Sequence, residues 1–223
     1  MSALSDNLAA ALDLHAKGRP THPAIVSGPE DLDHRAFANR VRGLAAALAA
    51  RGTGAGAFVG VALKDTAWHC AAIFALARLG AVMVPIDWRW TQAEAESLAG
   101  HFGVTQVLME SDAPPFAGVE ELRLAPALAA EADAPTSAAE VPLASGGDRP
   151  VILSLSSGTT GRPTGPLATH AMMRARVENQ LAALTFNQHD RHLLPTPLYF
   201  GGGRAFAISH LFIGATLILH PPP

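Results

Sequence analysis

The chain has 223 residues, enough for one large domain or two small ones. Hydrophobic residues make up 49% and charged residues only 16%, against a typical charged share of about 25%, and this excess suits α/β architecture, in which strands are covered on most sides. A formal net charge of −3 offers no basic field for nucleic acid.

The cellular setting follows from what the sequence lacks. A single cysteine, Cys70, excludes an intrachain disulfide. Residues 1–20 lack the basic-then-apolar pattern of a signal peptide. No stretch reaches the ~18 uninterrupted apolar residues of a membrane-spanning helix. We therefore expect a soluble cytoplasmic protein without a membrane span.

Helical and strand-like patterns alternate through the first half of the chain. In chain order we expect a helix at 6–16, a strand at 23–26, a helix at 33–51, a strand at 58–63, a helix from 65 or 66 to 79, a strand at 81–85, a helix opening at 91 and a strand at 105–109. Asp33 is expected to cap the second helix, Gly80 to end the third, and Thr91 with Glu94 to form a capping box. The third helix is apolar on nearly every face, which predicts burial. The alternation predicts an α/β fold of βαβ units with a mostly parallel sheet.

The pattern changes after residue 111. Residues 112–149 are rich in alanine, proline and acidic residues and predict a long surface connection with one short helix. Beyond it we expect a strand at 151–155, a helix at 170–184, a strand at 192–195, a glycine-rich helix entry at 201–203 and a strand at 215–219. The predicted division is therefore an N-terminal α/β subdomain (1–111), a connection (112–149) and a second α/β segment (150–223).

Residues 156–165 are the segment that indicates chemistry rather than packing. They follow an expected strand and bring together five hydroxyl side chains and three glycines, with one basic and no acidic side chain. Such a segment has little apolar surface to bury, but its backbone N–H groups and hydroxyls can form an anion-binding nest. We expect it to bind a polyphosphate through Ser156, Ser157, Gly158, Thr159, Thr160, Gly161, Arg162, Thr164 and Gly165.

Two common nucleotide-binding signatures do not fit the chain. The pattern G-x-x-x-x-G-K-[ST] fails because Pro163 stands five positions after Gly158. The dinucleotide pattern G-x-G-x-x-G fails after Gly201 and Gly203, because Phe206 occupies the position of the third glycine.

The segment instead resembles the phosphate loop of the adenylate-forming superfamily, which comprises acyl-CoA synthetases, luciferases and nonribosomal-peptide adenylation domains. The usual pattern of that family is Ser/Thr-Ser-Gly-Thr-Thr-Gly-x-Pro-Lys-Gly. Residues 156–165 match it at every position except the lysine, where this chain has Thr164. Residues 44–52, 75–85 and 197–203 also resemble the N-terminal sequence of the family, so the likeness covers nearly the whole chain.

The resemblance implies an AMP-forming acid–thiol ligase. In this family a carboxylic acid, such as a fatty or aryl acid, reacts with ATP to give an acyl-adenylate and pyrophosphate. The acyl group then passes to the thiol of CoA or of a carrier protein. ATP, Mg²⁺ and CoA are thus implied, and the loop would stabilise the charge that builds on the pyrophosphate.

Two positions depart from the family pattern. Thr164 removes a cation that relatives direct at the phosphates. A hydrogen bond to a charged group contributes roughly 1.5–3 kcal/mol, so its loss weakens transition-state stabilisation about tenfold to a hundredfold. Arg162 could compensate, although we favour a solvated loop residue. Phe200 stands where relatives often have histidine. Two roles stay open for its side chain, namely packing against an acyl or aryl group and packing in the core. The candidates for lining the substrate pocket are Tyr199, Phe200, Gly202 and Gly203.

The remaining chemically suggestive residues are better explained by structure. The ten histidines lack a convincing ligand set for a metal, and no cysteine pair supports one. We expect His170 to have a structural role at the start of a helix rather than a catalytic one. His69 and Cys70 are adjacent on a helix and point in different directions, so a core thiol is expected. The three tryptophans are interpreted as packing residues, and no catalytic residue is assigned.

The resemblance also implies that the full reaction needs more chain. Relatives continue with a Tyr-Gly-x-Thr-Glu nucleotide-binding segment, a ribose-binding aspartate and a small C-terminal domain that carries a catalytic lysine. We therefore expect the 223-residue chain to be an incomplete part with little activity alone. Two alternatives stay open: a non-catalytic remnant that acts as an interaction module, and an unrelated nucleotide-binding enzyme such as an NAD-dependent dehydrogenase.

Overall fold

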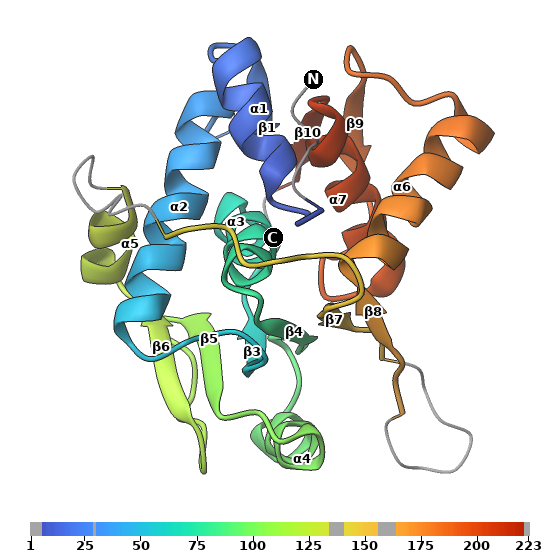
Figure 1. Ribbon diagram of the computed structural model, residues 1–223. Coiled ribbons are helices and arrows are strands. Elements are labelled where there is room, and N and C mark those ends of the chain that lie inside the picture. Colours follow the sequence, from blue (N-terminus) through green and yellow to red (C-terminus); the bar gives the residue numbers. More distant parts are fainter. Residues whose placement is uncertain (1–5, 29, 134–140, 156–163, 221–223) are drawn as a thin grey trace.

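The computed structural model describes residues 6–28, 30–133, 141–155 and 164–220 (Figure 1). Its helices are α1 (Ala10–Gly18), α2 (His34–Ala50), α3 (Ala67–Leu79), α4 (Gln92–Phe102), α5 (Pro126–Asp133), α6 (His170–Leu184) and α7 (Gly201–Ile213). Its strands are β1 (Pro23–Val26), β2 (Leu32–Asp33), β3 (Phe58–Ala62), β4 (Val82–Pro85), β5 (Gln106–Glu110), β6 (Glu120–Leu124), β7 (Pro150–Leu153), β8 (Leu167–Thr169), β9 (Arg191–Leu194) and β10 (Thr216–Leu219).

The strands form two mostly parallel sheets, which confirms the predicted α/β class. The smaller sheet has the order β2-β1-β10-β9 and the larger one the order β6-β5-β3-β4-β7-β8. Only the outer pairs β1–β2 and β7–β8 are antiparallel among the described strands. The sequence did not separate the two sheets. In the smaller one, β1 pairs with the distant β10 and places Ile25 opposite Leu217.

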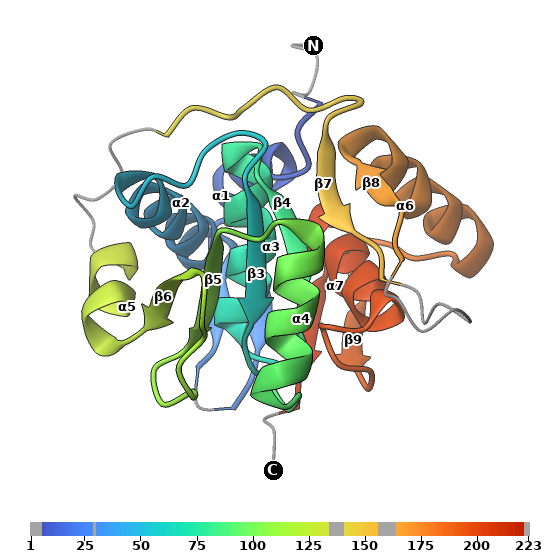
Figure 2. The same cartoon turned by 90° about the horizontal axis from the view of Figure 1, so that it is seen from below.

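Helix α3 lies at the centre of the molecule, between the two sheets (Figures 1 and 2). Apart from Trp68, all of its residues are buried, and its side chains share one core with β1, β3 and β10. The predicted burial of this apolar helix is confirmed. On the opposite face of the larger sheet, α4 packs Leu98 against a second core that contains Val84 and Ile86.

Local signals account for the helix ends. Asp33 accepts a hydrogen bond from the backbone N–H of Ala36 at 2.7 Å, and Thr91 with Glu94 forms the expected reciprocal capping box. Gly80 ends α3 with a φ of +71°, the left-handed conformation that favours glycine. Helix α1 begins at Ala10 rather than at the predicted residue 6, and in the turn before it the side-chain oxygen of Asn7 accepts from the backbone N–H of Ala9 at 2.9 Å.

Strands β2, β6 and β8 were not predicted. Strand β6 lies within the expected connection 112–149 and pairs in parallel with β5, where Leu122 stands opposite Leu108. The short helix expected in that connection is α5. The division at residues 111 and 149 stays a prediction.

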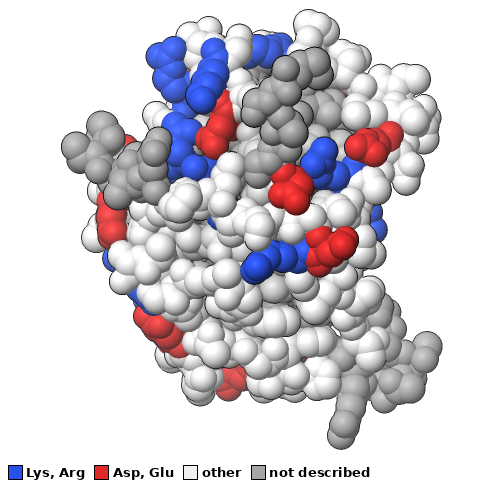
Figure 3. All heavy atoms as spheres, viewed as in Figure 1, with Lys and Arg blue, Asp and Glu red and all other residues white. Residues whose placement is uncertain are grey.

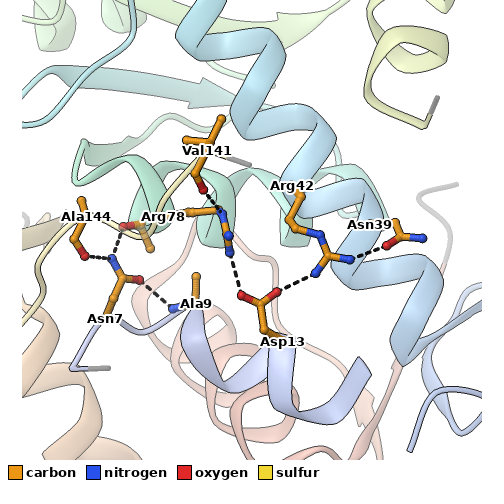
Figure 4. A network of polar contacts seen from close by, with 9 residues as sticks. Asn7, Ala9, Asp13, Asn39, Arg42, Arg78, Val141 and Ala144 are labelled. Atoms are coloured by element: carbon orange, nitrogen blue, oxygen red, sulfur yellow. Dashed lines mark hydrogen bonds and ion pairs between the residues drawn. The ribbon is translucent and has the colours of Figure 1, made fainter. Parts of the chain in front are cut away.

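A polar network fixes the N-terminal segment to α2 and α3 (Figure 4). The carboxylate of Asp13 accepts from Arg78 at 2.9 Å and from Arg42 at 2.6 Å. The amide nitrogen of Asn7 donates to the carbonyl oxygens of Ala77 at 2.8 Å and Ala144 at 3.0 Å. The segment that leads into β7 is thereby held against α3.

The surface matches the low charge content of the sequence. On the face shown in Figure 3, most residues are uncharged, and basic and acidic side chains among the described residues are interspersed. Within the described part of the chain, none of the helices is long and apolar enough to cross a membrane.

Candidate functional site

The carboxyl ends of β3 and β4 meet where the chain leaves the larger sheet toward opposite faces. Helix α3 follows β3 on one face, and α4 follows β4 on the other (Figure 2). In open α/β sheets, ligands bind outside the carboxyl ends of the strands at such a switch point. Residues 63–66 and 86–91 emerge there. The topology therefore places a candidate site in the crevice that these two segments border.

The candidate phosphate loop starts at the same edge of the sheet. Strand β7 runs parallel to β4 and leads into the loop, and β8 returns antiparallel to it. The backbone N–H of Ser154 donates to the carbonyl oxygen of Pro166 at 3.0 Å. A Cβ atom on Gly165 would lie 2.6 Å from the carbonyl oxygen of Ser154. Only glycine therefore allows the two ends of the loop to pack this closely.

Most of the predicted phosphate-binding residues lie outside the described residues, namely Ser156, Ser157, Gly158, Thr159, Thr160, Gly161 and Arg162. Of the other two, Thr164 is exposed and Gly165 is half-buried. Their role toward phosphate stays a prediction.

The segment that joins β9 to α7 is held from two sides. The carboxylate of Asp65 accepts from the backbone N–H of Leu198 at 2.7 Å. From the opposite side, Nη1 of Arg204 donates to the carbonyl oxygens of Leu198 at 3.1 Å and Tyr199 at 2.7 Å. Burial raises the pKa of Asp65, and the N–H of Leu198 opposes this shift. The backbone of residues 198–199 is thus fixed relative to both β3 and α7.

Arg89 links the segment after β4 to Tyr199. Its guanidinium donates to both carboxylate oxygens of Asp87, at 3.0 and 2.8 Å, and to the phenolic oxygen of Tyr199 at 2.7 Å. Burial opposes ionisation of Asp87, but the hydrogen bonds from Arg89 outweigh it and hold the pKa of this carboxyl below its usual range. The Arg89 side chain is 53% exposed, so part of its charge faces the crevice.

A cavity of about 460 Å³ opens between the ends of β3, β4, β9 and β10. Its lining residues are Asp65, Trp88, Arg89, Leu193, Leu194, Pro195, Thr196, Pro197, Leu219 and His220. A second cavity of about 250 Å³ lies on the α4 side, and Trp88 borders both. Apolar walls with a few convergent polar groups are typical of sites for small organic ligands.

The four residues predicted to line the substrate pocket are absent from the lining of the larger cavity. Tyr199 contacts the cavity wall through Arg89. Phe200 is 58% exposed, so packing in the core does not explain it. Gly203 lies under the preceding turn, since a Cβ atom there would be 2.3 Å from the carbonyl oxygen of Thr196. A Cβ on Gly202 would meet only the Phe200 ring, at 3.4 Å. Substrate contact by these four residues stays a prediction.

Sequence reasoning missed Asp65, Arg89 and Arg204, and it interpreted Trp88 as a packing residue. Trp88 is 37% exposed and borders both cavities. The available signal was position, because Asp65, Trp88 and Arg89 each follow closely on an expected parallel strand. Arg204 had no such signal.

The structure agrees with the interpretation of Cys70 as a core thiol and of His170 as a residue at a helix start. Cys70 is buried, and burial raises the pKa of its thiol, which makes it unreactive. The neighbouring His69 contacts the carbonyl oxygen of Leu63 at 3.0 Å. His170 is the first residue of α6, and its Nδ1 accepts from the backbone N–H of Leu8 at 3.0 Å.

Three comparisons relate the chain to known proteins. The sequence profile of the AMP-binding enzyme family matches residues 12–223. The chain is 30% identical over 228 residues to indoleacetate–CoA ligase of Aromatoleum aromaticum, which covers 94% of this chain and 44% of that protein. It is 28% identical over 204 residues to long-chain-fatty-acid–CoA ligase FadD13 of Mycobacterium tuberculosis, with 83% and 38% covered. The chain thus spans less than half the length of these two relatives.

The fold has a counterpart among solved structures. The N-terminal domain of FACL13 from Mycobacterium tuberculosis matches with a TM-score of 0.87 and 25% sequence identity. The match covers 97% of this chain and 57% of the other chain. The arrangement of the two sheets is therefore shared with that domain.

Proposed function

Because the chain belongs to the AMP-binding enzyme family, whose profile matches residues 12–223, we propose that it carries the phosphate-binding part and part of the acid-binding site of an AMP-forming acyl-CoA ligase. In this reaction a carboxylate oxygen attacks the α-phosphorus of ATP, and pyrophosphate leaves. The thiol of CoA or of a carrier protein then displaces AMP from the acyl-adenylate. The observation that carries the proposal is that the loop leaves β7 at the same sheet edge as the 460 Å³ cavity.

The loop would act on the phosphates of ATP. Its N–H groups and hydroxyls would serve as donors for the charge that develops on pyrophosphate. Among the described residues there is no group of three or more His, Cys, Asp or Glu that could hold a metal ion. In the proposed reaction Mg²⁺ would enter with ATP, since this ion commonly takes phosphate oxygens and water as most of its ligands.

The crevice beside the loop suits an apolar acid. Leu193, Trp88 and Leu219 supply apolar surface to the larger cavity, and Arg89 adds a cation. Phe200 follows the lining residue Pro197 by three positions, and its exposed ring could add aromatic surface for the acid. The names of the two curated relatives, which refer to indoleacetate and long-chain fatty acids, support an aryl or fatty acid.

We further propose that these residues bind phosphate but need additional chain for efficient adenylation, because the relatives are more than twice as long as the matched region. A cytoplasmic location belongs to the same proposal.

Calorimetric titration of the 223-residue chain with tripolyphosphate, ATP and NAD tests the proposal. We expect tripolyphosphate and ATP to bind with similar affinity and NAD not to bind. Thr160→Val removes one loop hydroxyl and is expected to weaken tripolyphosphate binding about tenfold, from roughly 1.5 kcal/mol for a charged hydrogen bond. Thr21→Val removes an exposed hydroxyl before the amino end of β1 and is the matched control.

The other outcomes identify the alternatives. Failure to bind either phosphate ligand contradicts the proposal and favours an interaction module of the same fold. ATP–pyrophosphate exchange by the chain alone, with indoleacetate or palmitate as the acid, contradicts the need for additional chain.

A further inference from the structure

Arg204 is a buried cation that lacks an acidic partner among the described residues. The residue is 3% exposed, and within the described part of the chain its side chain donates only to the carbonyl oxygens of Leu198 and Tyr199. The described ion pairs involve other arginines, such as Arg78 with Asp13. Burial and then the charge of Arg176 lower the pKa of Arg204 to about 10, so the side chain stays protonated at neutral pH.

This position does not favour a cation. Arg204 lies in the first turn of α7, where the helix dipole is positive. A buried charge without a counter-ion costs free energy that an apolar side chain of similar size does not. Filling space therefore does not account for an arginine, whereas its hydrogen bonds to two consecutive carbonyl groups do.

Other contacts also fix the position of the segment to which these two carbonyl groups belong. Asp65 holds the N–H of Leu198 from the β3 side. Gly203 lies within contact distance of the preceding turn. The backbone that carries Tyr199 is therefore held relative to both β3 and α7, and the phenol of Tyr199 meets Arg89 at 2.7 Å.

We infer that Arg204 is a positioning residue, which acts through the carbonyl groups of Leu198 and Tyr199 to hold the Tyr199 phenol on Arg89 and Phe200 in its exposed orientation. The inference deepens the proposed function and rests on it for one point, namely that the side chains of Tyr199 and Phe200 meet the acid. The positioning itself is a property of the chain without ligands.

Tyr199 is the only tyrosine in the chain, so incorporation of 3-fluorotyrosine yields one fluorine resonance that reports on this site. In the full chain with Arg204→Met, we expect this resonance to move more than halfway toward its position in urea-unfolded protein. The variant should still unfold cooperatively. Arg204→Lys retains a donor, and its resonance is expected to lie closer to the wild-type position than that of Arg204→Met. Arg78→Met removes another buried arginine that donates to a backbone carbonyl, at Val141, and should leave the resonance in place.

A wild-type resonance in folded Arg204→Met overturns the inference. Should that variant fail to fold, Arg204→Leu, which likewise lacks a donor for the two carbonyl groups, is read in its place by the same criterion. Addition of indole-3-acetate to the wild-type chain tests the proposed function separately. An unmoved resonance then counts against contact between the acid and Tyr199, whereas the ligand-free spectra alone decide the role of Arg204.

Discussion

Replacement of Gly203 by alanine tests whether α7 must approach the β9–α7 turn as closely as the structure indicates. The new Cβ would lie 2.3 Å from the carbonyl oxygen of Thr196 and 2.4 Å from that of Pro197. Real Cβ atoms essentially never come within 3.0 Å of another heavy atom, so backbone must move by more than half an ångström. Gly202→Ala is the matched control, because its Cβ would meet only the Phe200 ring at 3.4 Å.

The difference between the two variants isolates the close contact. Replacing a helical glycine with alanine stabilises the folded state by up to about 1 kcal/mol, and this gain applies to both variants. Overpacking costs ~1–3 kcal/mol and applies to Gly203→Ala alone. We therefore expect Gly203→Ala to be ~1–3 kcal/mol less stable than Gly202→Ala. Urea unfolding followed by far-UV circular dichroism measures this difference. Equal stability of the two variants would refute the packing argument.

Three further predictions concern the loop, a helix cap and pH. Thr164→Lys adds the cation of the family pattern, and we expect calorimetry to show about tenfold to hundredfold tighter ATP binding, from roughly 1.5–3 kcal/mol; unchanged affinity contradicts this. Asp33→Ala removes the N-cap acceptor of α2 and should cost about 1 kcal/mol in urea unfolding, whereas Asp33→Asn, which keeps an acceptor, should cost much less. Burial is the main cause that lowers the pKa of His34, His69 and His170 from 6.5 to about 4. The unfolded chain then binds more protons, so stability is full above about pH 6.5 and falls as the pH drops toward 4. Equal unfolding free energies at pH 7 and pH 5 would contradict this.

Local signals in the sequence determined much of the secondary structure. The Asp33 cap, the Thr91–Glu94 capping box and the helix end at Gly80 act within a few residues, so each could be predicted from its neighbours. The burial of α3 followed from apolar residues on nearly every face. Residues 156–165 likewise indicated their family, because a phosphate loop depends on residue types at short, fixed spacings.

The candidate site was decided only by the tertiary structure. Its contacts join residues far apart in the chain: Asp65 and Leu198 are separated by 133 positions, and Arg89 and Tyr199 by 110. The division of the strands into two sheets depends in the same way on the pairing of β1 with β10. Hydrophobic periodicity predicts that a strand exists but does not identify its neighbour, because any apolar strand can supply the same buried face. The partners are selected by the packing of the whole core around α3, and that packing brings the polar ends of distant strands into one crevice.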